Sequence, residues 1–161
     1  DVFRVEMGSW QRGDVDGYEV SIPGTAGSAR GTFVDMGNPH VVAVIEDAFS
    51  SLPTVEQLDL VTKPVVAPRI ESDQNVEFVR IDEQSEGDNE GNATMRVNER
   101  GCGETLSCGT GLCATAITLR AKTGIDHWTI TVRGGTLRLD VTDNDVKLTG
   151  SATIVGKIEL L

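Results

Sequence analysis

The sequence predicts an α+β fold in which short, mostly antiparallel strands wrap around one central, buried helix. Two observations predict it. Runs of β-branched and aromatic residues of strand length recur along the chain. One segment, 109–123, carries no charge before its last turn, and a helix without a polar face is expected in a core. The 161 residues suffice for a single domain, which we take to be 1–161.

Strand signals come first along the chain. Runs bounded by Gly, Pro or Asp predict strands at Thr32–Met36, Val41–Ile45 and 76–82. An acidic, glycine-bearing segment between Gln84 and Asn92 predicts a hairpin loop. That loop would join the third strand to a fourth over 93–98.

The rest of the chain supplies one helix signal and further strands. A small polar residue and an early proline at Ser51–Pro53, followed by apolar spacing near 3.6, predict a short helix that starts near Thr54 and ends before Pro64. After residue 126, alternating runs separated by tight turns predict antiparallel strands. These runs are Trp128–Val132, Leu137–Val141, Val146–Leu148 and 152–160.

Cys108 immediately precedes the predicted buried helix, within the sequence Ser-Cys-Gly-Thr-Gly of residues 107–111. The unpaired amides of the first helical turn should lie near its sulfur and favour the thiolate. A helix N-terminus can lower a thiol pKa from its usual value of about 8.5, which would give a base or nucleophile near neutral pH. The same amides could bind a ligand carboxylate. The alternative is a buried cysteine that only caps the helix.

Other candidate site residues lie in loops that could face this cysteine. Arg100 could hold a substrate carboxylate in a bidentate clamp. Glu99 could orient an ammonium group or tune the thiol, although an adjacent Glu-Arg is also typical of a surface ion pair. The turn Gly37–His40 carries a carboxamide and an imidazole, and Asn75 begins a predicted strand.

Composition excludes several classes of partner. The net charge of −11 repels phosphate backbones and anionic lipid headgroups, so we expect neither nucleic acid nor membrane as a partner. The longest apolar run, Val41–Ile45, is far shorter than the roughly 20 residues that cross a bilayer. Three cysteines cannot form a closed disulfide framework, which favours a reducing, cytoplasmic location. Their spacing lacks the paired ligands of a zinc site, so we expect no metal, with Cys113 packed in the core.

Three blocks in this order resemble the signature blocks of the diaminopimelate epimerase family: Gly37–His40, Asn75–Val79 and Asn98–Gly111. The resemblance runs from about Gly31 to the C-terminus. It implies that the chain is the C-terminal catalytic half of a two-domain enzyme, whose last strands return towards the N-terminal half. The family's other Cys-Gly-x-Gly block, which supplies the second catalytic cysteine, has no counterpart in 1–161.

The resemblance implies cofactor-independent epimerisation of LL-diaminopimelate to the meso form, in lysine and peptidoglycan precursor biosynthesis. Two cysteines flank the Cα, one removing a proton and the other returning one from the opposite face. It implies that Cys108 is one of this pair, that His40 and Glu99 tune the cysteine pKa values, and that the enzyme is a homodimer. The implied substrate contacts are Asn38, Asn75, Glu99, Arg100, Gly109 and Thr110.

Three other interpretations stay open. A proline racemase-like isomerase would share the two-cysteine chemistry, although the block Asn98–Gly101 argues against it. A half-domain with one cysteine could bind an amino acid or carboxylate without turnover. A Cys-His-Glu acyl transferase would need a hydrogen bond between His40 and Cys108.

Overall fold

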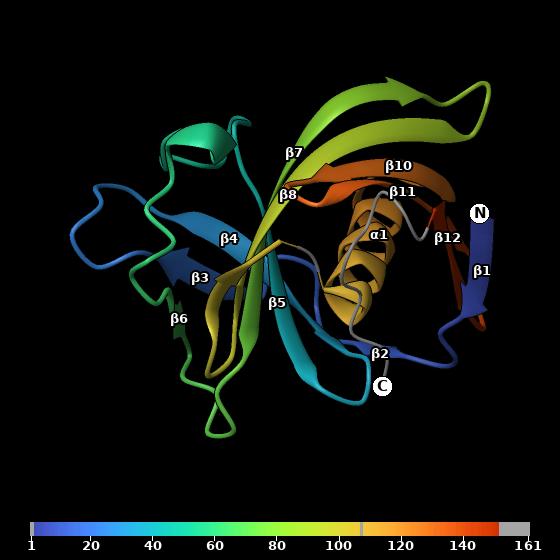
Figure 1. Ribbon diagram of the computed structural model, residues 1–161. Helices are drawn as coiled ribbons and strands as arrows, with labels where there is room; N and C mark the ends of the chain where they lie inside the picture. The colour runs from blue at the N-terminus through green and yellow to red at the C-terminus, as the bar shows by residue number, and fades with distance from the viewer. Residues whose placement is uncertain (1, 107, 152–161) are drawn as a thin grey trace.

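The computed structural model describes residues 2–106 and 108–151 and confirms the α+β class (Figure 1). Its strands are β1 (Val2–Glu6), β2 (Gln11–Arg12), β3 (Tyr18–Ser21), β4 (Ala29–Asp35), β5 (Pro39–Val44), β6 (Val65–Ala67), β7 (Asn75–Ser85), β8 (Glu90–Glu99), β9 (Gly103–Thr105), β10 (His127–Val132), β11 (Gly135–Val141) and β12 (Val146–Ser151). The helices are η1 (Val55–Gln57), a single 3₁₀ turn, and α1 (Gly109–Thr123).

The strands form one mixed sheet in the order β1-β12-β11-β10-β8-β7-β5-β4-β3-β6, with β2 paired to β4 and β9 to β8. Two pairings, β5 with β7 and β8 with β10, are parallel, and the other pairings within the described residues are antiparallel. The mostly antiparallel arrangement is therefore confirmed. The parallel pairing of β5 with β7 matters for the site, because it places the starts of these two strands side by side.

Most predicted strands are present with shifted ends. The predicted hairpin is the pair β7 and β8, which turns over residues 86–89 and aligns Val76 with Asn98. The predicted strands after residue 126 are β10, β11 and β12. The predicted strand over 152–160, and with it the return towards another half, lies outside the described residues.

The predicted short helix after Pro53 is confirmed only in part, because it forms as the three-residue 3₁₀ helix η1. Thr54 makes no side-chain capping hydrogen bond at its start. Instead, the Arg96 guanidinium of β8 donates to the carbonyls of Val55 and Leu58, at 2.8 and 3.0 Å. These two hydrogen bonds tie the segment that contains η1 to strand β8.

Helix α1 is buried, as its lack of charge predicts. Every residue from Gly109 to Leu119 is buried, and the basic residues Arg120 and Lys122 lie in the last turn. Gly124 ends the helix in the left-handed region with φ 79°, and its amide donates to the Arg120 carbonyl. The helix contacts strands β4, β5, β7, β10, β11 and β12. Within the described ranges, no helix is both long and apolar enough to cross a membrane.

Strand β5 and the first five residues of β7 are buried on both faces. Val42 and Val79 pack towards α1, whereas Val41 and Phe78 face a second core on the other side of the sheet. A strand between two cores is expected to be apolar at successive positions. Because side chains alternate along a strand, His40 lies on the face of Val42, and Glu77 on the face of Val79. Two polar side chains thus point into the helix side of the core.

Candidate active site

The site is centred on the first turn of α1. Cys108 is the N-cap residue, with an extended backbone (φ −140°, ψ 118°) and no side-chain capping bond. Its carbonyl accepts the Leu112 amide at 2.9 Å. Its sulfur, Sγ, lies 3.4 Å from Oγ1 of Thr110. Cys108, Gly109 and Thr110 are all buried, so the chain places a thiol and a hydroxyl together inside the protein.

The turn between β4 and β5 brings Asn38 and His40 to this helix end. Gly37 adopts φ 97°, and its amide donates to the Asp35 side chain at 2.8 Å, which shapes the tight turn. Nε2 of His40 lies 3.1 Å from Oγ1 of Thr110 and 3.1 Å from Oδ1 of Asn38. Asn38 also donates to Thr110 at 3.4 Å. The structure therefore gathers four predicted residues: Asn38, His40, Cys108 and Thr110.

Glu77 also belongs to this cluster, and sequence reasoning missed it. Its Oε2 lies 2.8 Å from Nδ1 of His40, and both side chains are completely buried. Its other oxygen, Oε1, has no hydrogen-bond partner within the described part of the chain. The sequence did offer one signal for Glu77, an ionisable residue between the apolar residues Val76 and Phe78. The first five residues of β7, Glu77 among them, are all buried.

The expectation of a Cys108 thiolate is wrong for this structure. Burial, and next the negative charge of Glu77, raise the pKa of Cys108 to about 12. The Thr110 hydroxyl and the Gly111 amide act in the opposite direction, as a helix N-terminus should, but they are outweighed. Cys108 as a whole is only 1% exposed, so water does little to stabilise a thiolate there. Cys108 is a thiol here.

The remaining predicted contacts form a second group at the ends of β7 and β8. The Asn75 side chain donates to the Pro39 carbonyl at 3.0 Å and accepts the Arg100 amide at 2.7 Å. Arg100 is exposed and donates to the Ser72 carbonyl at 3.1 Å. Glu99 is buried and accepts the hydroxyl of Thr105. Asn75 lies opposite His40 in the sheet, and the charge of Glu99 also raises the pKa of Cys108, so the two groups are neighbours.

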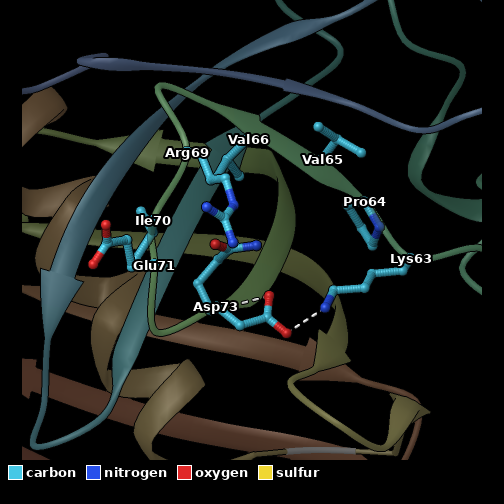
Figure 2. Close-up of a pocket in the computed structure, with 9 residues that line it drawn as sticks. Lys63, Pro64, Val65, Val66, Arg69, Ile70, Glu71 and Asp73 are labelled. Atoms are coloured by element: carbon cyan, nitrogen blue, oxygen red, sulfur yellow. Dashed lines mark hydrogen bonds and ion pairs between the residues drawn. The ribbon is translucent and has the colours of Figure 1, made fainter.

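A separate pocket of about 520 Å³ has Gln74, the residue before Asn75, among its lining residues (Figure 2). It is lined by β6 and the segment before β7, where Lys63 and Asp73 form an ion pair and the Arg69 side chain points inward. None of the predicted site residues lines it. Because its ionisable side chains are at the surface and no cysteine or histidine borders it, we place the candidate chemistry at the helix end.

The other cysteines and histidine lie outside the cluster. Cys113 is buried within α1 and packs in the core, as predicted. Cys102 is exposed, and neither forms a disulfide. Nδ1 of His127 contacts Asp140 on β11 at 2.6 Å. Across residues 2–106 and 108–151, no group of three or more His, Cys, Asp and Glu side chains is placed to hold a metal ion.

The site thus consists of a buried cysteine at the N-terminus of the buried helix of an α+β domain, with a histidine and a carboxamide beside it. Residues 32–155 match the diaminopimelate epimerase family. The chain is 39% identical to the diaminopimelate epimerase of Phocaeicola vulgatus, covering 87% of this chain and 48% of that protein. It is 38% identical to that of Streptomyces coelicolor, with coverage of 91% and 49%.

This chain belongs to the diaminopimelate epimerase family. It spans about half the length of the curated relatives it matches. The resemblance drawn from the three sequence blocks is thereby confirmed, and the roles of individual residues remain proposals.

Proposed function

We propose that the protein containing this chain converts LL-diaminopimelate to meso-diaminopimelate by proton transfer at Cα, with Cys108 as one of two acid/base cysteines. Family membership supports the substrate, because the matching relatives are named diaminopimelate epimerase. The observation that carries the role of Cys108 is its place at the N-terminus of buried α1, in contact with Thr110. The proposal needs neither metal nor cofactor.

The raised pKa of Cys108 supports a role as the thiol that gives a proton to Cα. The second cysteine, which removes the opposite proton, would come from sequence outside these 161 residues. Each transfer is balanced, since one Cα–H bond breaks at one sulfur while another forms from the second sulfur. By this proposal the chain alone is a half-site, and 1–161 is one domain of a two-domain enzyme.

The proposed substrate contacts fall into the two groups of residues described above, one at the start of α1 and one at the ends of β7 and β8. Gly109 and Thr110, at the helix N-terminus, would receive the α-carboxylate. Asn75, Glu99 and Arg100 would hold the distal amino-acid end, which only a diamino diacid supplies. Arg100 is exposed and so is available to a ligand. We also propose that strands wrap α1, that the enzyme is a cytoplasmic homodimer, and that it serves lysine biosynthesis.

Acyl transfer by a Cys-His-Glu site is less well supported. Such a mechanism needs the imidazole to take the proton from the sulfur directly. Thr110 contacts both groups, and no hydrogen bond joins His40 to Cys108 among the described residues. Carboxylate binding without turnover is favoured for the isolated chain, because a single buried thiol cannot serve both faces of a Cα.

The test is deuterium incorporation into LL-diaminopimelate in heavy water, measured by mass spectrometry with the stereochemistry of the product. The full-length protein should incorporate deuterium with inversion, and Cys108→Ala should abolish both. Cys102→Ser is the matched control and should retain activity, because Cys102 lies in an exposed turn. Activity that survives Cys108→Ala would overturn the proposal. Exchange catalysed by the 161-residue chain alone would contradict the need for a second cysteine.

A further inference from the structure

The family resemblance implies that His40 tunes a cysteine pKa and gives no part to Glu77, although the two are in direct contact. They lie on the neighbouring parallel strands β5 and β7, on the face that packs against α1. Oε2 of Glu77 is 2.8 Å from Nδ1 of His40, and neither side chain is exposed to solvent. The carboxyl group also borders the helix start, since a Cβ atom on Gly111 would lie 2.7 Å from Oε2.

The burial of this pair decides its total charge. A buried carboxylate beside a neutral imidazole would be an uncompensated charge, which the protein interior disfavours strongly. Oε1 of Glu77 accepts no hydrogen bond from the described residues, and His40 and the backbone amide of Glu77 offset the cost of burying the charge only in part. A neutral pair, which holds one more proton, removes the problem. Burial also raises the pKa of Glu77, which favours the same added proton.

The contacts at the other ring nitrogen show where the protons lie. In a neutral pair, one proton is shared between Oε2 of Glu77 and Nδ1 of His40, and Nε2 carries its own proton. Nε2 faces two oxygens at 3.1 Å, Oδ1 of Asn38 and Oγ1 of Thr110. The carbonyl oxygen of Asn38 can only accept, so a proton on Nε2 satisfies it, whereas a bare Nε2 would face it with a lone pair.

We propose that Glu77 is a positioning residue: it shares one proton with Nδ1 of His40 and so holds the imidazole with a proton on Nε2, directed at Asn38 and Thr110 beside Cys108. This inference rests on the proposed function, because it specifies how His40 acts on Cys108, the proposed acid/base residue. His40 is then a donor and cannot take a proton at Nε2. Thr110 accepts from it and is free to donate its own hydroxyl proton to Sγ of Cys108.

This chain of donors has a consequence for the thiol. The described ionisable groups whose charge acts on Cys108 are Glu77, on β7, and Glu99, on β8, and both disfavour its thiolate. A proton shared by Glu77 and His40 weakens the first of these effects. A donor hydroxyl on Thr110 stabilises any negative charge that forms on the sulfur during proton transfer.

The test is ¹⁵N NMR of the 161-residue chain, labelled in its histidines, which reads the protonation of each ring nitrogen without turnover. The chain has two histidines, and Nδ1 of His127 contacts Oδ1 of Asp140 at 2.6 Å. Asp140→Asn is therefore the matched control for Glu77→Gln. In the unsubstituted chain at pH 7, we expect a proton on Nε2 of His40. We expect the ¹⁵N chemical shift of Nδ1 to lie between those of a protonated and an unprotonated ring nitrogen.

Glu77→Gln should shift the ¹⁵N signal of Nδ1 of His40 to the value of an unprotonated nitrogen, because a glutamine amide donates a hydrogen bond to that nitrogen. Nε2 should remain protonated. Asp140→Asn should change the signals of His127 and not those of His40. An unprotonated Nε2 of His40 in the unsubstituted chain would overturn the proposal. An Nδ1 chemical shift that is the same in Glu77→Gln as in the unsubstituted chain would also overturn it. If Glu77→Gln fails to fold, the unsubstituted spectrum alone decides where the protons lie.

A kinetic measurement on the full-length protein tests the positioning role. Glu77→Gln should lower kcat by about tenfold or more with little change in KM, because Glu77 lies behind the imidazole and touches none of the proposed distal substrate contacts. An unchanged kcat would contradict the role. If the full-length protein has no epimerase activity, the proposed function fails while the NMR result still stands, so the two failures are distinguishable.

Discussion

The hydroxyl of Thr110 lies 3.4 Å from the sulfur of Cys108, two residues away in the first turn of α1. The same hydroxyl lies 3.1 Å from Nε2 of His40. Thr110 thus separates the imidazole from the thiol and connects them through one oxygen atom. A histidine here can influence the cysteine without taking its proton directly.

The first prediction concerns this hydroxyl. Thr110 lowers the pKa of Cys108 against the opposing effects of burial and Glu77, so Thr110→Val should raise that pKa further. Because a hydrogen bond to a charged group contributes about 1.5 to 3 kcal/mol, alkylation of Cys108 at a fixed pH should slow by about tenfold or more. Thr110→Ser keeps the hydroxyl and should react at nearly the original rate. Equal rates for the two variants would show that the contact has no effect on the thiol.

The second prediction concerns the pH dependence of Cys108 itself. With a pKa of about 12, the thiolate fraction should increase about tenfold per pH unit and should not level off below pH 10. Iodoacetamide alkylation, mapped by mass spectrometry, measures this rate. Cys102→Ser removes the exposed competitor. A plateau near pH 8 would mean that the helix N-terminus outweighs burial after all.

The pKa of Cys108, which is raised and not lowered as the sequence predicted, is a property that sequence pattern could not predict. Local pattern predicted the helix start and the buried helix, and the family resemblance named Asn38, His40 and Thr110 as site residues, but their contacts with one another came only from the structure. The pKa of a thiol depends on how many atoms exclude water from it and on charges from other strands. Burial and the Glu77 charge both come from the tertiary packing of β7 against α1, which no local pattern records.

The missed elements have a related explanation. Strands β3 and β6 pair with each other across more than forty residues of sequence, aligning Val20 with Val66, and each is only three or four residues long. Short strands of this kind are defined by their partners more than by their own composition. The predicted helix after Pro53 is shorter than expected for a related reason, since Arg96 binds carbonyls of this segment from another strand.

The third prediction uses the raised pKa of Glu77, which burial causes. A carboxyl group with a higher pKa in the folded state keeps its proton while the unfolded chain releases it, so stability falls as the pH rises above the usual value of 4.5. Glu77→Gln removes this dependence. The free energy of unfolding of Glu77→Gln, relative to the unsubstituted chain, should therefore increase between pH 4.5 and pH 8, by about 1.4 kcal/mol per unit of pKa shift.

Urea titrations at several pH values measure this difference. The slope of unfolding free energy against urea should be the same for both chains, which confirms that the same structure unfolds. A difference that stays constant with pH, or that shrinks as the pH rises, would contradict a raised pKa for Glu77 in the folded protein.

The fourth prediction concerns Gly111, whose missing side chain makes room for the Glu77 carboxyl group. A Cβ atom at position 111 would lie 2.7 Å from Oε2 of Glu77 and 3.3 Å from Cβ of Cys108. The neighbouring carboxyl group is held by His40 and cannot swing away without breaking their contact. Gly111→Ala should therefore lower the free energy of unfolding by about 1 to 3 kcal/mol, despite the higher helix propensity of alanine.

Gly87→Ala is the matched control, because a Cβ atom at position 87, in the exposed β7–β8 turn, would meet no atom within 4 Å. Its free energy of unfolding should change by no more than about 0.5 kcal/mol. The double variant Gly111→Ala with Glu77→Ala removes the clashing carboxyl group, so the cost of the alanine should be smaller there than in the unsubstituted chain. Additive effects of the two changes would show that Gly111 and Glu77 do not compete for the same space.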